Sequence, residues 1–119
     1  MTLDDLIETA ASNQAVSPSD VESVARESGV TVPQLLDLFA RTVAIRYLRD
    51  DYSYTFADIA INQLFAFAHG ESGPGLSDFA WQVYDAFDGG EYSRDGDDTD
   101  QPEQLTRELL GHLGLAGGA

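Results

Sequence analysis

The chain contains no cysteine, no lysine and no long hydrophobic run. Without cysteine it cannot form a disulfide framework, a thiolate zinc site or a cysteine nucleophile, which fits a cytoplasmic protein. Its most apolar stretch, residues 59–68, is well short of the roughly 20 apolar residues that a membrane helix needs. The first residues are acidic where a signal peptide would be basic. We therefore expect a cytoplasmic protein with neither a signal peptide nor a membrane span.

Positive charge is also scarce. Six arginines stand against 21 acidic residues, and the formal net charge is -15 over 119 residues. Phosphates and anionic lipids bind to clustered lysine and arginine, so we expect no nucleic acid and no membrane as partner. The hydrophobic fraction of 43% is typical of one globular domain, spanning residues 1–119. An acidic host proteome would explain the overall charge equally well, so composition alone leaves its role open.

Apolar residues recur at helical spacing between capping signals along the chain. We predict caps at Thr2, Ser17, Thr31, Thr55 and Ser77, and Gly29 as the turn that ends the second helix. The predicted helices span residues 3–11, 18–28, 32–50, 56–69, 78–88 and 102–113. No segment alternates like a strand. The prediction is an all-α, single-domain bundle of five or six helices, with an acidic loop over 89–101 and a flexible tail over 114–119.

Residues 24–35 resemble the DNA-binding helix-turn-helix, with Ala25 at the helix crossing and Gly29 in the turn. A recognition helix presents basic or amide side chains to the groove. This one offers Gln34 and an acidic residue before its first arginine, Arg41. We interpret the segment as a helix pair within the bundle rather than as a DNA reader.

Three polar residues, Asp58, Asn62 and His69, fall on one side of an otherwise apolar predicted helix. Buried polar groups need partners, and Arg46 on the preceding helix is a candidate partner for Asp58. A metal or acid–base site would need more ligands than one histidine and one acid. We predict a structural polar network of these four residues and no metal.

Helical spacing places Trp81, Asp85 and Asp88 together on a side of their helix that does not face the core. An aromatic residue flanked by carboxylates is typical of a partner-binding surface, although Trp81 could instead cover a neighbouring helix. Residues 85–103 hold eight acids and one base, Arg94. The predicted partner-binding residues are Trp81, Asp85, Asp88, Glu91, Tyr92, Asp95, Asp97, Asp98 and Asp100.

A calcium loop is the first alternative for these acids. Asp95, Asp97 and Thr99 have the spacing of the first three EF-hand ligands. Asp100 stands where that loop needs glycine, and Thr106 stands where it needs glutamate. No nucleophile elbow, zinc-protease, phosphate-loop or dinucleotide motif is present either. We therefore expect no enzyme activity, no metal and no cofactor.

The segment 83–92 (VYDAFDGGEY), with Asp58 and Asn62 upstream and Thr106 downstream, resembles a signature of small, acidic, uncharacterised bacterial proteins. In overall character the chain is similar to immunity proteins of bacterial toxin systems, which are small, acidic and helical and block a basic toxin. The resemblance implies a non-enzymatic, immunity- or antitoxin-like protein that docks a basic partner such as a toxin domain. A helical accessory or regulatory domain with proteome-driven acidity is the alternative, and a DNA mimic is the third. The oligomeric state stays open.

Overall fold

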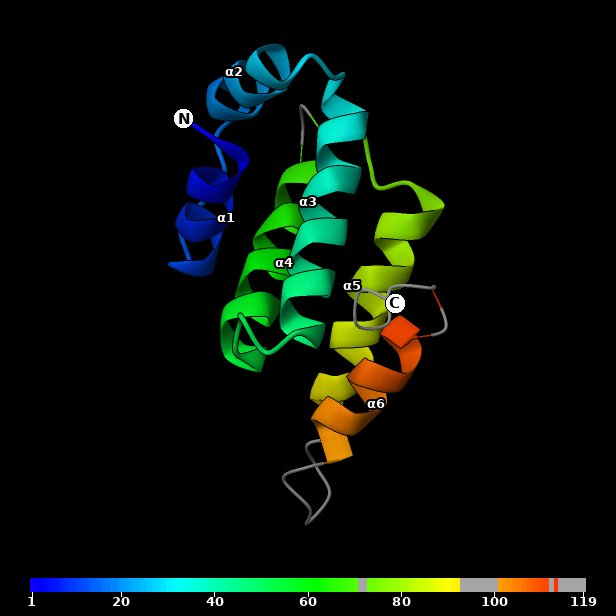
Figure 1. Cartoon of the computed structure of the whole chain (residues 1–119). Coiled ribbons are helices and arrows are strands. Elements are labelled where there is room, and N and C mark those ends of the chain that lie inside the picture. Colours follow the sequence, from blue (N-terminus) through cyan, green and yellow to red (C-terminus); the bar gives the residue numbers. More distant parts are fainter. Residues whose placement is uncertain (71–72, 93–100, 112, 114–119) are drawn as a thin grey trace.

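The computed structural model describes residues 1–70, 73–92, 101–111 and 113, with the backbone alone for 89–92 and 101–105. This part of the chain is all helical and contains no strand. Its six helices are α1 (Leu3–Ala11), α2 (Pro18–Ser28), α3 (Val32–Leu48), α4 (Tyr54–Ala68), α5 (Asp78–Tyr92) and α6 (Gln101–Gly111). The helices α3 and α4 run side by side through the middle, α1 and α5 flank them, and α6 packs on α5 (Figure 1). The prediction of an all-α bundle is confirmed.

The first three helices begin where the sequence predicts. The Thr2, Ser17 and Thr31 side chains each accept a hydrogen bond from the backbone at the third helical position. Gly29 ends α2 in the left-handed conformation, with φ of 70°. This turn brings α2 back onto α3, so the helix-turn-helix resemblance corresponds to a packed helix pair in the bundle. Within the described residues, no helix is long and apolar enough to cross a membrane.

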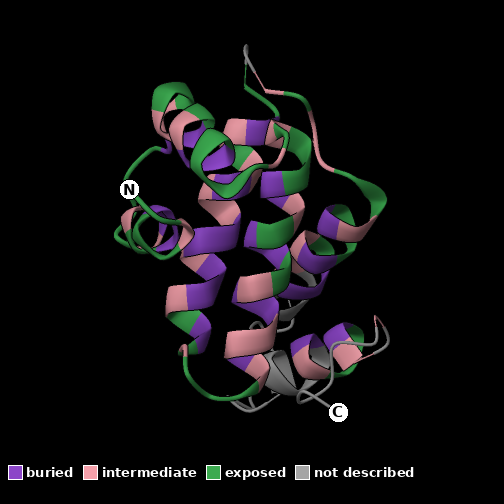
Figure 2. Cartoon of the chain, turned by 45° about the horizontal axis from the view of Figure 1, so that its top comes forward, coloured by how far each residue is buried: buried purple, intermediate pink, exposed green. Residues whose placement is uncertain are grey.

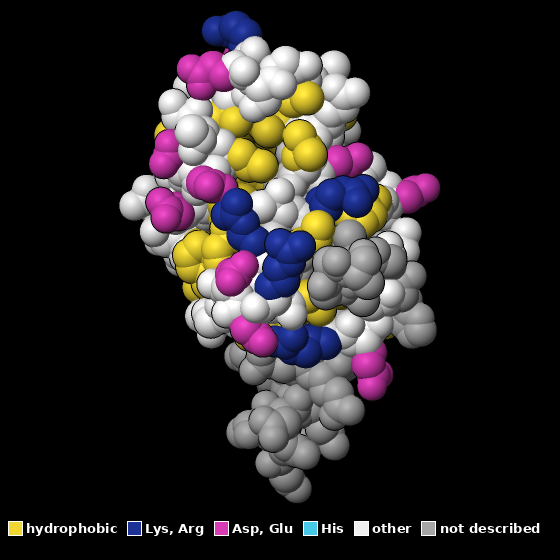
Figure 3. Space-filling model, viewed as in Figure 1, with side chains coloured by type: hydrophobic (Ala, Val, Ile, Leu, Met, Phe, Trp, Pro, Cys, Tyr) yellow, Lys and Arg dark blue, Asp and Glu magenta, His cyan; other side chains and the backbone are white. Residues whose placement is uncertain are grey.

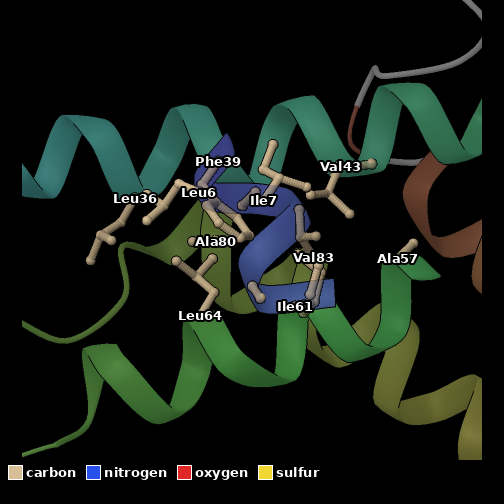
Figure 4. Packing of buried hydrophobic residues seen from close by; sticks show 14 of the residues in the cluster. Leu6, Ile7, Leu36, Phe39, Val43, Ala57, Ile61, Leu64, Ala80 and Val83 are labelled. Atoms are coloured by element: carbon tan, nitrogen blue, oxygen red, sulfur yellow. The ribbon is translucent and has the colours of Figure 1, made fainter. Parts of the chain in front are cut away.

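One apolar core joins all six helices. Each helix has a buried stripe that faces the interior (Figure 2). At the centre, Leu6 and Ile7 of α1 lie between the side chains of α3 and α4, beside Phe39 and Ile61 (Figure 4). α3 carries a long apolar stripe that is fully buried. α3 therefore forms the spine against which the other helices pack.

α4 begins earlier than predicted. Its cap is Ser53, which accepts from the Phe56 amide at 3.1 Å, and not Thr55. Starting the helix at Tyr54 puts that ring on the buried side, where its hydroxyl donates to the Phe87 carbonyl at 2.8 Å. A long-range hydrogen bond in the interior therefore favours the earlier start. The buried side of α4 carries Ala57 and Ile61, whereas Phe56 is partly buried at its margin.

α5 also runs further than predicted, through Gly89 and Gly90 to Tyr92. Each glycine disfavours a helix by about 1 kcal/mol relative to alanine. Packing against α6 offsets this cost, because Thr106 donates to the Ala86 carbonyl at 2.9 Å and Leu110 is fully buried beside it. The predicted acidic loop over 89–101 is therefore shorter. Residues 93–100 and the predicted tail over 114–119 lie outside the described residues.

Candidate functional site: an acidic and aromatic face

Four rings from α4 and α5 form a cluster at the surface. Phe65 stacks on Tyr84 with centroids 4.2 Å apart, and Trp81 meets Phe65 edge-on at 5.5 Å. The His69 ring lies 4.5 Å from Phe65 and 5.2 Å from Trp81. Such pairs contribute about 0.5–1.5 kcal/mol each beyond their buried area. We call Phe65, His69, Trp81 and Tyr84 the surface aromatic cluster.

The cluster holds Trp81 firmly while leaving much of it in contact with solvent. Trp81 is 37% exposed, His69 is exposed, and Phe65 and Tyr84 are half-buried. The sequence left open whether Trp81 covers a neighbouring helix or faces outward, and the structure shows that it does both. The rings contact one another directly, in one stacked pair and several edge-on or tilted pairs, so the cluster offers a partly exposed aromatic surface.

Three carboxylates accompany Trp81 along α5. Asp78, Trp81, Asp85 and Asp88 follow one another at spacings of three, four and three, which places them on one side of the helix. Asp78 and Asp85 are exposed, and Asp88 is half-buried. Within the described part of the chain, none of the three carboxylates forms an ion pair. We call these four residues the α5 face.

Contacts with α3 fix the first turn of α5. Ser77 caps the helix by accepting from the Ala80 amide at 3.2 Å, and its hydroxyl donates to the Asp37 carboxylate. The Arg41 guanidinium lies over the Phe79 ring, 4.8 Å from its centroid. The α5 face is therefore presented by an anchored helix, which lowers the entropy cost of binding a partner.

Comparison with protein-family models, curated proteins and solved structures found no match. The function of the α5 face must therefore be argued from its geometry and charge.

The other predicted partner-binding residues fall into two groups. Glu91 and Tyr92 belong to the last turn of α5 and not to a loop. Asp95, Asp97, Asp98 and Asp100 lie outside the described residues. In the part of the chain that is described, no group of three or more acidic or histidine side chains is placed to hold a metal ion.

The predicted polar network does not bring its four members together. Arg46 binds Asp4 at 2.9 Å and donates to the Tyr52 hydroxyl at 2.7 Å. The hydrogen bond with Tyr52, followed by that with Asp4, raises the pKa of Arg46 above its usual value. His69 has its ring contacts in the surface aromatic cluster, while Asp58 is buried and Asn62 half-buried in α4. Arg46 and His69 thus serve different parts of the surface.

Most of the arginines gather along α3. Figure 3 shows most of the dark blue side chains on the face along which α3 runs. Arg41, Arg46 and Arg49 belong to α3 or its end, and Arg107 of α6 reaches the same end of α3. We call these four residues the α3 face. Arg107 binds Asp50 at 2.6 Å and lies 4.5 Å from the centroid of the Tyr47 ring.

Sequence analysis missed Phe65, His69 and Tyr84 as neighbours of Trp81. Phe65 and His69 are four residues apart on α4, and Trp81 and Tyr84 are three apart on α5, so each pair shares a helix face. From these spacings the sequence could have predicted one aromatic face on each helix. Only the packing of α4 against α5 shows that the two faces meet.

Proposed function

We propose that this protein is a non-enzymatic, cytoplasmic binding protein of immunity or antitoxin type. Its α5 face docks a basic protein, with Trp81 as the anchor and the neighbouring carboxylates as the charged rim. The observation that carries the proposal is an exposed tryptophan, braced by three rings and flanked by carboxylates without ion pairs among the described residues.

The chemistry of this face supports a cationic protein partner. Tryptophan is enriched among the residues that dominate protein–protein binding energies, above all where it is pre-positioned. Carboxylates around such an anchor attract a positive partner over several ångströms and raise its association rate at low salt. A net charge of -15 extends that attraction beyond the face itself.

The test is affinity capture from the source cell, followed by calorimetry with the purified partner. Trp81→Ala should weaken binding about 30-fold or more, as expected for an anchor residue contributing about 2 kcal/mol. Replacing Asp78, Asp85 and Asp88 by asparagine should weaken binding and flatten its salt dependence.

A matched control removes the same number of charges elsewhere. Glu8→Gln, Glu22→Gln and Asp51→Asn alter exposed acids on α1, on α2 and after α3. This control should retain most of the affinity. If the control and the α5 variant lose affinity equally, or if the captured partner is not basic, the proposal fails.

The spread of acids over other helices favours the alternative of an accessory or regulatory domain with proteome-driven acidity. Exposed carboxylates also lie on α1 and α2, far from Trp81 in sequence. That alternative expects no dependence on Trp81 at all. The Trp81→Ala measurement therefore separates the two candidates.

A further inference from the structure

A small hollow adjoins the α5 face where α5 meets α6. Its volume is about 210 Å³, well above what one water molecule needs. The described residues that line it are Gln82, Asp85, Ala86, Leu109 and Leu113. Asp85 belongs both to the hollow and to the α5 face, so the two surfaces are continuous.

The wall from α6 is apolar and open. Leu109 is 37% exposed, although its neighbour Leu110 is fully buried against α5. Leu110 and the hydrogen bond from Thr106 to Ala86 hold α6 in place. The exposed part of Leu109 is available for apolar contact with a ligand in the hollow.

The rim from α5 is polar. Gln82 and Asp85 are both exposed and stand three residues apart, so their side chains are neighbours on the helix surface. Asp85 makes no ion pair within the described residues. Gln82 and Asp85 thus supply an amide oxygen and a carboxylate as acceptors at a hollow whose other described lining residues are apolar.

We propose that this hollow receives an arginine side chain from the basic partner. An arginine places its methylene stem against apolar surface and keeps its charged end at a polar rim. Its planar guanidinium has five donors in a fixed fork, which suits two neighbouring acceptors better than the single ammonium of lysine. This inference rests on the proposed function for its biological role, but the hollow itself can be tested without the partner.

The test is a titration of ¹⁵N-labelled protein with N-acetyl-arginine amide, followed by amide chemical shifts. The citrulline analogue is the matched probe, because it has nearly the same shape without the charge. Arginine should shift the amides of Gln82, Asp85, Ala86, Leu109 and Leu113 and bind at least five-fold more tightly than citrulline. The lysine analogue should bind more weakly than arginine.

Three variants assign the contacts. Asp85→Asn should abolish the preference for arginine over citrulline, whereas Asp78→Asn, a charge change elsewhere on the α5 face, should leave it intact. Leu109→Ala should weaken binding of both probes about equally. The inference is overturned if arginine and citrulline bind alike, if the shifts spread evenly over all exposed acids, or if Asp78→Asn acts like Asp85→Asn.

A second copy of the chain is the other possible occupant of the apolar wall. In that case Leu109→Ala would lower the molar mass measured by light scattering, and the inference would fail.

Failure of this inference can be told apart from failure of the proposed function. Partner binding that depends on Trp81 but not on Leu109 overturns the arginine site alone. Arginine binding in the hollow without a Trp81-dependent partner overturns the proposed function alone.

Discussion

Two clusters of aromatic rings include residues from both α4 and α5, and they differ in what surrounds them. Tyr47, Tyr54 and Phe87 are buried, with ring centroids 5.3–6.0 Å apart. The Tyr54 hydroxyl donates a hydrogen bond to the Phe87 carbonyl. The surface aromatic cluster has similar ring spacings but is open to solvent at Trp81 and His69.

The charged side chains near the two clusters also differ, in whether they form ion pairs among the described residues. Arg107 lies over the Tyr47 ring and binds Asp50, so a cation beside the buried cluster is paired within the chain. The carboxylates of the α5 face make no ion pair among the described residues. The first cluster is part of the core, and the second faces solvent on the proposed docking surface. The predictions below test this contrast from the largest expected effect to the smallest.

The largest effect is expected from truncating a ring in each cluster. Phe87→Ala removes a ring that is only 1% exposed and should lower the free energy of unfolding by about 3–5 kcal/mol. Trp81→Ala should lower it by less, about 2 kcal/mol, because 37% of that side chain is already exposed to water. Urea unfolding measures both.

The contrast would be wrong if Trp81→Ala destabilised the protein as much as Phe87→Ala. Because Phe87→Ala risks loss of folding, Phe87→Leu provides a milder variant. It should still lower the free energy of unfolding, by about 1 kcal/mol.

A smaller effect is expected from Arg107→Met. The methionine keeps the apolar stem but loses the ion pair with Asp50, the hydrogen bond to the Leu48 carbonyl and the ring contact with Tyr47. We expect a loss of about 1 kcal/mol, because the pair is partly exposed and surface pairs contribute little. Arg49→Met, at an exposed arginine of the same face, should change stability by less than about 0.5 kcal/mol. Equal losses in both variants would show that Arg107 has no special role.

Features that depend on one or two turns of chain could be predicted from the sequence. The caps Ser17 and Thr31 and the left-handed turn at Gly29 all depend on neighbouring residues alone. The side of α5 that carries Trp81 and Asp85 follows from helical spacing in the same way.

Features decided by contacts between helices were missed. α4 starts at Tyr54 because its hydroxyl reaches Phe87, 33 residues further along the chain. α5 continues through two glycines because α6 packs against its last turns. The neighbours of Trp81 come from α4, and no periodicity within α5 can indicate them.

A still smaller effect, of opposite sign, is expected from neutralising Asp85 and Asp88. They are like charges three residues apart, and Asp88 lies near the C-terminal end of α5, where the dipole disfavours anions. The variant carrying Asp85→Asn and Asp88→Asn should gain about 0.3–0.5 kcal/mol in urea unfolding at low salt. Asp78 lies in the first turn, so Asp78→Asn should lose a few tenths of a kcal/mol. A stability loss in the double variant would mean that these carboxylates already have partners within the chain.

The smallest effect concerns a carboxylate that has a hydrogen-bond partner among the described residues, whereas the carboxylates of the α5 face form no ion pair there. Asp5 accepts from the Thr2 amide at 2.9 Å, and this hydrogen bond lowers the pKa of Asp5 below its usual value. A lowered folded-state pKa contributes stability above the unfolded value of about 3.9 and loses it as pH falls through the folded value. Asp5→Asn should therefore reduce the melting temperature at pH 7, and its curve should converge with that of the wild type at the lowest pH. Glu8→Gln alters an exposed acid of the same helix, and its curve of melting temperature against pH should run parallel to that of the wild type. If the curve of Asp5→Asn also ran parallel to that of the wild type, the hydrogen bond to Asp5 would contribute no pH-dependent stability. The contrast between this helix and the α5 face would then lose its electrostatic basis.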